Sequence, residues 1–183
     1  PDAIKDTAAE LFETQQIDIL VNNAGIIHRE KADTFAEENW HNVLNVNLNS
    51  LFILTQLAGR HMLKRGHGKV INIASLLSFQ GGILVPAYTA SKHAVAGLTK
   101  SFANEWAASG VQVNAIAPGY ISTANTQPIR DDEKRNEDIL KRIPAGRWGK
   151  ADDIGGTAVF LASRASDYVN GHILAVDGGW LAR

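Results

Sequence analysis

Four short apolar runs, separated by longer stretches with helical spacing, constrain the fold of this chain more than any other feature. The runs cover residues 17–21, 69–74, 111–117 and 173–176. Each consists mostly of apolar residues, which is typical of strands that are buried on both faces. Strands that alternate with helices form right-handed crossovers and therefore a parallel sheet with helices on both sides. The sequence thus predicts an α/β fold, a doubly wound parallel sheet, in a single domain over 1–183.

The stretches between these runs carry apolar residues at the spacing of a helix. In the stretch 37–65, Asn47 falls within the apolar stripe. A buried amide needs hydrogen-bond partners, so Asn47 is either a structural hydrogen bonder or part of a site. The charges of 130–142 are typical of a solvated surface helix. We predict helices at 2–14, 37–65, 87–109, 130–142 and 151–162.

The composition argues against several classes of function. The chain has 18 basic and 19 acidic residues and a net charge of −1, so nothing favours binding to nucleic acid or to an anionic membrane surface. There is no cysteine, which rules out disulfides, thiolate catalysis and cysteine-ligated metal. No apolar run approaches the roughly 18 residues that a membrane span requires. We expect a soluble, cytoplasmic protein without a metal site, a nucleic-acid partner or a membrane partner.

The segment 75–92 carries the residues best suited to chemistry. Tyr88 and Lys92 lie four residues apart in a predicted helix and therefore share one face. An ammonium group beside a phenol favours the phenolate, so we expect a lowered pKa for Tyr88. Tyr88 would then be a general acid/base, with the Ser75 hydroxyl orienting the group that it protonates. The alternative is a tyrosine and a lysine on an ordinary amphipathic helix.

Small and polar residues follow two of the predicted strands. The carboxyl ends of parallel strands are where open α/β sheets bind ligands, and small residues let a ligand approach the backbone closely. The alternative at each position is a plain turn. The segments are Asn22-Asn23-Ala24-Gly25 and Pro118-Gly119, the second followed by Ile121 and Thr123.

Together these motifs resemble the short-chain dehydrogenase/reductase family in order and spacing, over the whole chain. The resemblance implies a Rossmann-like fold and hydride transfer to or from a nicotinamide cofactor. It implies that Tyr88 exchanges a proton with the substrate oxygen and that Ser75 positions this oxygen. It also implies that Lys92 lowers the pKa of the tyrosine and holds the nicotinamide ribose, and that Asn47 anchors a water molecule in a proton relay.

The same resemblance implies a cofactor site at the carboxyl ends of the strands. We expect NAD as the cofactor, with NADP not excluded. The expected cofactor-binding residues are Asn23, Ala24, Gly25, Tyr88, Lys92, Pro118, Gly119, Ile121 and Thr123.

Further segments resemble the sugar-acid dehydrogenases of this family, in particular those that act on keto-deoxy sugar acids from uronic-acid polysaccharides. Gluconate dehydrogenases share part of the pattern and remain an alternative. A cation is expected to bind the substrate carboxylate. The candidates are Arg29, Arg130 and Arg147, of which Arg147 is taken with Ser75 and Tyr88 as a substrate-binding residue. The segments include 78–81, 85–88, 117–120, 143–149 and 165–171.

The start of the chain departs from the family pattern. Family members open with a strand and a glycine-rich turn that binds the pyrophosphate, whereas this chain begins within the predicted helix 2–14. By analogy we expect about 70 N-terminal residues, a βαβ portion, to be missing. The resemblance also implies a homotetramer built on the helices 37–65 and 87–109. An alternative of another class is a non-catalytic subunit that serves only to build an oligomer.

Overall fold

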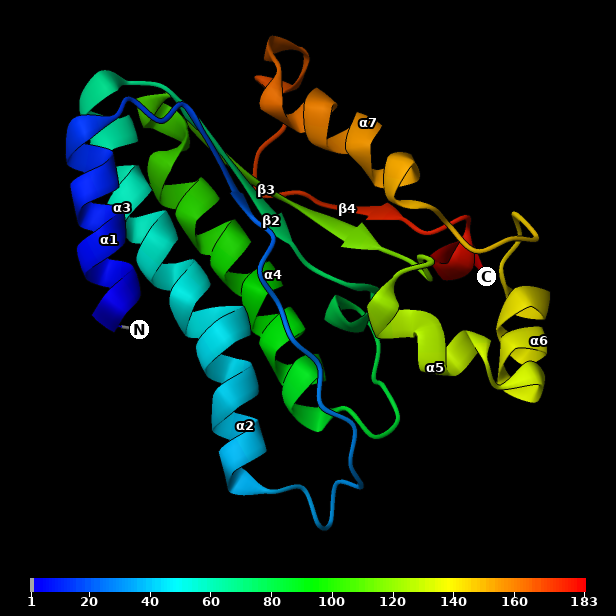
Figure 1. Ribbon diagram of the computed structural model, residues 1–183. Coiled ribbons are helices and arrows are strands. Elements are labelled where there is room, and N and C mark those ends of the chain that lie inside the picture. The colour runs from blue at the N-terminus through cyan, green and yellow to red at the C-terminus, as the bar shows by residue number, and fades with distance from the viewer. Residues whose placement is uncertain (1) are drawn as a thin grey trace.

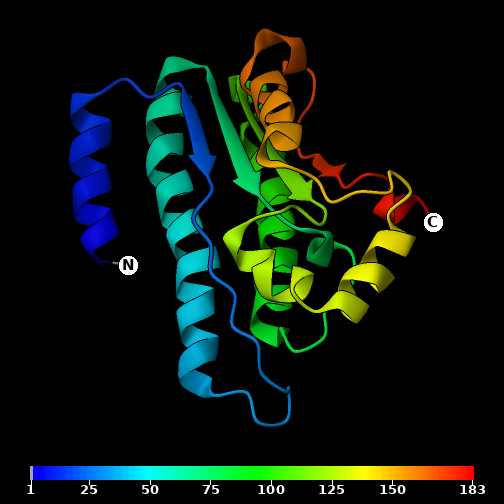
Figure 2. The ribbon, with the colours of Figure 1, turned by 45° about the vertical axis from the view of Figure 1, so that its right-hand side comes forward.

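A computed structural model describes residues 2–183, and side chains from Ile4 onward. Its sheet has four strands, all parallel, in the order β1-β2-β3-β4. The strands point toward the side of the molecule on which α5 (Gln127–Arg130) and α6 (Glu133–Arg142) lie (Figures 1 and 2). The parallel α/β sheet that the sequence predicts is therefore confirmed. The strands are β1 (Ile19–Asn22), β2 (Gly68–Ile73), β3 (Val111–Pro118) and β4 (Ile173–Val176).

Helices cover both faces of the sheet, as expected for a doubly wound fold (Figure 1). Alternate residues of β2 and β3 separate the two cores: Val70 and Val113 pack with α1, α3 and α4, whereas Ile71 and Ile116 pack with Leu161 of α7. Two short helices, α5 and α6, follow β3 at its carboxyl end. The helices are α1 (Asp2–Thr14), α3 (Ser50–Arg65), α4 (Pro86–Trp106), α5 (Gln127–Arg130), α6 (Glu133–Arg142) and α7 (Ala151–Ala162).

The helix predicted over 37–65 is interrupted in its middle. It consists of α2 (Glu37–Leu44), a π-helical turn over Asn45–Asn49, and α3. A π turn inserts one extra residue into the helix and is frequent at functional sites. The apolar stripe of the sequence continues through it, because Val43, Asn47 and Leu51 are all buried. Periodicity therefore predicts the helix but not the change in winding at Asn47.

A buried chain of side-chain hydrogen bonds ties the sheet to α3 and α4. The Asn22 amide donates to Thr55 Oγ1 and to Asn72 Oδ1, both at 2.9 Å, and the Asn72 amide donates to Thr99 Oγ1 at 2.9 Å. Buried polar groups are costly unless they are paired, so this chain favours one register of β1, β2 and the two helices. The carboxyl ends of β1 and β2 are held level as a result.

Within the described residues, β1 pairs only with β2 and forms one edge of the sheet. Leu20 packs toward α3, whereas Ile19 and Val21 are 45% and 46% exposed. Side chains alternate between the two faces of a strand, so the exposed pair lies on the face that α7 covers farther along the sheet.

Within residues 2–183, none of the helices has the length and hydrophobicity of a membrane span, and no three His, Asp or Glu side chains are grouped so that they could hold a metal ion.

Candidate active site

The segment after β2 brings Ser75 against the first turns of α4. Ser75 caps a short 3-10 turn, and its Oγ accepts a hydrogen bond from the Leu77 amide at 3.2 Å. The Ser78 hydroxyl donates to the Lys92 carbonyl oxygen at 2.7 Å, which fixes this turn to α4. Because α4 begins at Pro86, Tyr88 lies in its first turn. A strand end and a helix start thus place the serine and tyrosine hydroxyls together.

Lys92 is buried next to the tyrosine. Its ammonium group donates to the Ile73 carbonyl oxygen at 2.6 Å and lies 5.5 Å from the centroid of the Tyr88 ring. Lys92 is only 4% exposed. Burial disfavours the charged form and lowers the pKa of Lys92 from 10.5 to about 8.

The pKa of Tyr88 corrects one expectation from the sequence. Burial of the phenol raises the pKa of Tyr88 above 10.0, and this effect outweighs the hydrogen bond with Ser75 and the positive charge of Arg29, which both act to lower it. The predicted lowering by Lys92 is therefore wrong for this structure. The reason is that the burial of α4 removes water from the phenol, while the lysine ammonium is bonded to a backbone carbonyl. At neutral pH Tyr88 carries its proton and is suited to donate it.

Asn47 lies beside the site but turns its side chain to the loop after β1. Its Oδ1 accepts from the Ile26 amide at 2.8 Å, and its Nδ2 donates to the Ile26 carbonyl at 2.9 Å and to Ser91 Oγ at 3.2 Å. A methyl group at Gly25 would lie 3.5 Å from Asn47 Oδ1 and 3.8 Å from Lys92 Nζ. Asn47 therefore holds the glycine turn against the lysine, and its role in a proton relay stays a prediction.

A cavity of about 410 Å³ opens at the carboxyl ends of β1, β2 and β3. Lys92 is the one charged residue in its lining, beside Ser75 and Tyr88. At Gly119 a Cβ atom would lie 2.5 Å from the Asp177 Cα, so only glycine lets β3 end so close to the residue after β4. Besides Tyr88 and Lys92, the predicted cofactor-binding residues in this lining are Asn23, Gly25, Pro118, Gly119, Ile121 and Thr123; Ala24 is not part of it.

This lining suits a nicotinamide cofactor. A ribose needs hydrogen-bonding groups, which the Tyr88 hydroxyl, the Lys92 ammonium and the Asn23 amide offer, and a planar ring needs the close approach that the glycines permit. Of the predicted positions, Ala24 alone lies outside the cavity wall, and it is exposed.

A second cavity, of about 370 Å³, shares Ser75 and Tyr88 with the first and extends toward α6. Three arginines line it, Arg29, Arg135 and Arg142, and no aspartate or glutamate does. The two cavities also share Pro118, Gly119 and Thr126, so they adjoin at the serine and tyrosine hydroxyls, which line both a cavity with one cationic residue and a cavity with three.

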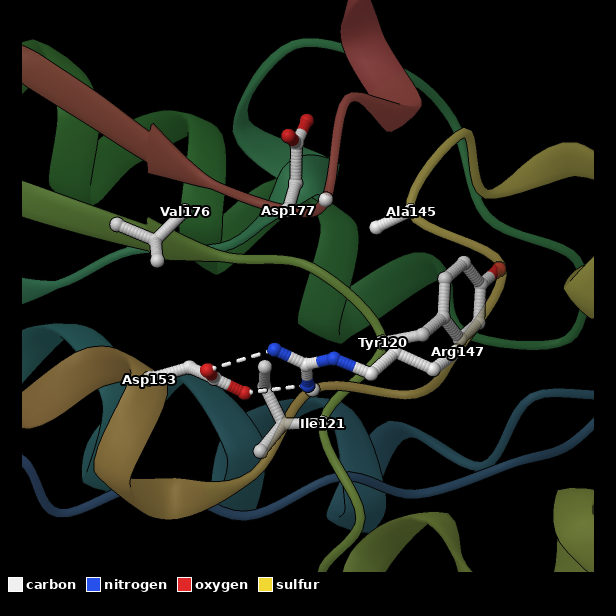
Figure 3. A pocket seen from close by; sticks show the side chains of 9 residues that line it. Tyr120, Ile121, Ala145, Arg147, Asp153, Val176 and Asp177 are labelled. Atoms are coloured by element: carbon white, nitrogen blue, oxygen red, sulfur yellow. Dashed lines mark hydrogen bonds and ion pairs between the residues drawn. The ribbon is translucent and has the colours of Figure 1, made fainter.

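The structure pairs Arg147 with an acidic side chain, and its contact with the substrate stays a prediction. Its guanidinium group pairs with both carboxylate oxygens of Asp153, at 2.7 and 2.9 Å (Figure 3). The two side chains line a separate hollow of about 250 Å³ together with Tyr120 and Asp177 (Figure 3). Arg130 is not in the cationic cavity either, since its guanidinium group bonds to the Thr123 carbonyl and to Gln127. Of the three candidates from the sequence, Arg29 alone lies in the cationic cavity.

Sequence reasoning missed Arg135 and Arg142, because the charges of this segment were attributed to solvation. The missed signal is their spacing. They lie seven residues apart with the buried Ile139 between them, so all three lie on one face of α6.

Comparison with known proteins places this site in a family. The profile of the family described as enoyl-(acyl carrier protein) reductase matches residues 1–181. A protein of Bacillus subtilis (strain 168) named 2-dehydro-3-deoxy-D-gluconate 5-dehydrogenase is 92% identical over 183 residues, which are all of this chain and 72% of the relative. The chain belongs to the short-chain dehydrogenase/reductase family. On the evidence of these relatives, the chain is an NAD(P)-dependent oxidoreductase.

Other short-chain dehydrogenases/reductases agree in sequence and in structure. The 2-dehydro-3-deoxy-D-gluconate 5-dehydrogenase of Escherichia coli (strain K12) is 60% identical over 182 residues, 99% of this chain and 71% of the relative. A solved structure from Beutenbergia cavernae, described as a candidate NAD(P)-dependent gluconate 5-dehydrogenase with bound NADP, is 53% identical with a TM-score of 0.98, over 100% of this chain and 73% of that one. A gluconate 5-dehydrogenase from Burkholderia cenocepacia J2315, in complex with NADP and tartrate, is 44% identical with a TM-score of 0.95, over 98% of this chain and 71% of that one.

Proposed function

We propose that this protein interconverts 2-dehydro-3-deoxy-D-gluconate and 3-deoxy-D-glycero-2,5-hexodiulosonate by hydride transfer at carbon 5, with NAD or NADP as the cofactor. The 92% identity to the Bacillus subtilis relative of that name supports the substrate. The structural observation that carries the proposal is that Ser75 and Tyr88 line both the cavity that holds Lys92 and the adjoining cavity that holds three arginines. A sugar acid is an anion, and a cavity lined by arginines without carboxylates attracts it.

The chemistry at Ser75 and Tyr88 is an exchange of one proton and one hydride. The nicotinamide, when bound, supplies or accepts the hydride at carbon 5. In reduction, Tyr88 donates its phenolic proton to the oxygen on carbon 5 as that oxygen gains charge, and in oxidation it takes the proton back. Ser75 donates a hydrogen bond to the same oxygen and holds it near the tyrosine. The raised pKa of Tyr88 keeps the phenol protonated at neutral pH, which is the form that donates the proton in reduction.

Lys92 has two roles in this proposal. Its ammonium group lies in the first cavity, where it would hold the ribose hydroxyls of the cofactor, and its pKa of about 8 lets it exchange protons near neutral pH. Asn23 and Gly25, in the turn after β1, line the same cavity and would contact the cofactor, and Ala24 between them is also proposed to do so. The remaining cofactor contacts are proposed at Pro118, Gly119, Ile121 and Thr123.

Assays of the purified natural protein test the proposal. NAD and NADP are each offered with 2-dehydro-3-deoxy-D-gluconate, with gluconate and with a neutral polyol, and kcat/KM is compared. We expect the keto-deoxy acid to be preferred over gluconate by at least tenfold. A preference for gluconate would favour the second candidate, since the Gluconobacter oxydans relative named gluconate 5-dehydrogenase is 44% identical. Turnover of none of the acids would refute the proposal and favour a subunit without catalysis.

We further propose a cytoplasmic homotetramer. Exposed apolar side chains on α7 support an interface, because Val159 is 69% and Phe160 38% exposed. Trp180, by contrast, is 4% exposed and packs in the chain's own core, so it caps that core and offers no surface to a partner. Light scattering of the natural protein should give four times the mass of one chain. Val159→Asp should reduce that mass, and an unchanged tetramer would exclude α7 from the interface.

A further inference from the structure

The cationic cavity has two arginine groups at different depths. Arg29 lies at the catalytic end, since it donates a hydrogen bond to the carbonyl oxygen of Asn125, which lines the first cavity together with Ser75 and Tyr88. Arg135 and Arg142 lie on α6 at the other end, where Arg142 stacks on Trp180. All three residues line the same cavity of about 370 Å³. An anion bound between Tyr88 and α6 would thus meet a cation at each end.

The two arginines of α6 have no acidic partner within the described residues. Other charged side chains nearby are paired, Lys141 with Glu137 at 2.7 Å and Arg147 with Asp153 at 2.7 Å. Within residues 4–183, no ion pair involves Arg135 or Arg142. Both residues are exposed, so water screens the repulsion between their charges, and the cavity offers an anion two guanidinium groups that no carboxylate already occupies.

Packing holds one of the two guanidinium groups in place. The Arg142 guanidinium lies 3.9 Å from the centroid of the Trp180 ring, and the Trp180 indole donates to Gln80 Oε1 at 3.3 Å. Trp180 is buried and also packs against Tyr120, with ring centroids 4.6 Å apart. A guanidinium that is already stacked loses little freedom when it binds a ligand, which favours bidentate binding of a carboxylate.

The chain length of the substrate separates its carboxylate from the reacting carbon. In a six-carbon acid that reacts at carbon 5, four carbon–carbon bonds separate the reacting carbon from carboxylate carbon 1. At roughly 1.5 Å per bond they extend to about 5 Å. With carbon 5 at Ser75 and Tyr88, the carboxylate lies away from the catalytic hydroxyls, toward the α6 end of the cavity.

We propose that Arg135 and Arg142 of α6 form the carboxylate-binding site of the substrate and set the preference for acids over neutral sugars. This inference rests on the proposed function and assigns to α6 the role that the sequence suggested for Arg147. Arg142 provides the oriented contact, and Arg135, one side chain two turns away, provides the second charge.

The test compares Arg135→Gln, Arg142→Gln and the double variant of the natural protein with Lys134→Gln, which removes the same charge from an exposed position on α6 outside the cavity. The readout is the ratio of kcat/KM for the sugar acid to kcat/KM for the matching carboxyl-free sugar. We expect each arginine variant to lower this ratio about 10- to 100-fold, mainly through KM for the acid, as for loss of a charge-assisted hydrogen bond. Arg142→Lys should recover part of the loss, and Lys134→Gln should leave the ratio unchanged.

Two results would overturn the inference. One is a change of less than threefold in the ratio for both arginine variants, and the other is an equal loss for the acid and the neutral sugar. Arg135→Gln keeps the Arg142–Trp180 stack, so it remains informative if Arg142→Gln fails to fold. If the unmodified protein turns over no sugar acid, the proposed function fails by itself. The arginine site is then judged by titrating tartrate into the protein–NADPH complex, where absent binding or equal binding by the double variant overturns it.

Discussion

Replacement of Lys92 by methionine should remove a dependence of stability on pH that few lysines produce. The pKa of Lys92 is lowered from 10.5 to about 8 by burial. Below about pH 8 the lysine is charged in both states, and the folded state bears the full cost of burying the charge. Between about pH 8 and pH 10.5 the unfolded chain keeps the proton and the folded protein releases it. The unfolded state then binds more protons, so the free energy of unfolding rises with pH in this window.

The size of this effect follows from the two pKa values. The difference between 10.5 and about 8 corresponds to about 3 kcal/mol, at about 1.4 kcal/mol for each pH unit. Methionine fills a similar volume without a charge, so Lys92→Met escapes the cost at pH 7. The variant also leaves the Ile73 carbonyl without its 2.6 Å hydrogen bond, which costs about 1–3 kcal/mol. The two changes oppose each other at pH 7, and only the charge term varies with pH.

Urea unfolding of the natural protein and of Lys92→Met, measured at intervals from pH 7 to pH 10, isolates the charge term. We expect the stability of the natural protein relative to the variant to rise by about 2–3 kcal/mol over this range. Lys100→Met is the control, because Lys100 lies exposed on the same helix and should show no such rise. A difference between the natural protein and Lys92→Met that stays flat from pH 7 to pH 10 would refute the argument. Turnover of Lys92→Met should be lost throughout.

Two further predictions concern the site. Tyr88→Phe should lower kcat about 10²- to 10⁴-fold while nucleotide binding, followed by fluorescence, is retained; more than a tenth of the activity would exclude Tyr88 as the acid/base. Gly119→Ala should lower the free energy of unfolding by about 1–3 kcal/mol, because its Cβ would lie 2.5 Å from the Asp177 Cα. Gly155→Ala is the control. Gly155 lies in α7, and a Cβ added there would meet no atom within 4 Å outside its own stretch of helix, so alanine should raise the free energy of unfolding by up to about 1 kcal/mol.

The sequence predicts those parts of the site that depend on order along the chain. Tyr88 and Lys92 share a helix face because of their spacing, and Ser75 meets them because a strand end and a helix start adjoin. The direction of the Tyr88 pKa depends on how much water the folded chain removes from the phenol, and spacing carries no information on that. The π turn at Asn47 leaves the apolar stripe unbroken, so hydrophobic periodicity cannot predict it.

The arginines show that the pairing of charges cannot be predicted from the sequence either. Arg147 lies in a segment that resembles sugar-acid dehydrogenases. In the structure its guanidinium group forms two hydrogen bonds with Asp153, six residues later in the first turn of α7. Arg135 and Arg142 occur in a run of charges that is typical of solvated helices. Only the packing of Ile139 into the core turns that face of α6 toward the cavity. Which charge is free and which is paired is a property of the tertiary structure.

The position of Ser75 and Tyr88 in the lining of two adjoining cavities has a consequence for how such enzymes diversify. The first cavity lies at the ends of β1, β2 and β3, whereas residues of α6 and Trp180 line only the second. Changes in that outer helix can therefore retune which molecules are admitted without disturbing the redox partner. A few substitutions on α6 can then change the substrate specificity, while the hydroxyl groups of Ser75 and Tyr88 keep their positions.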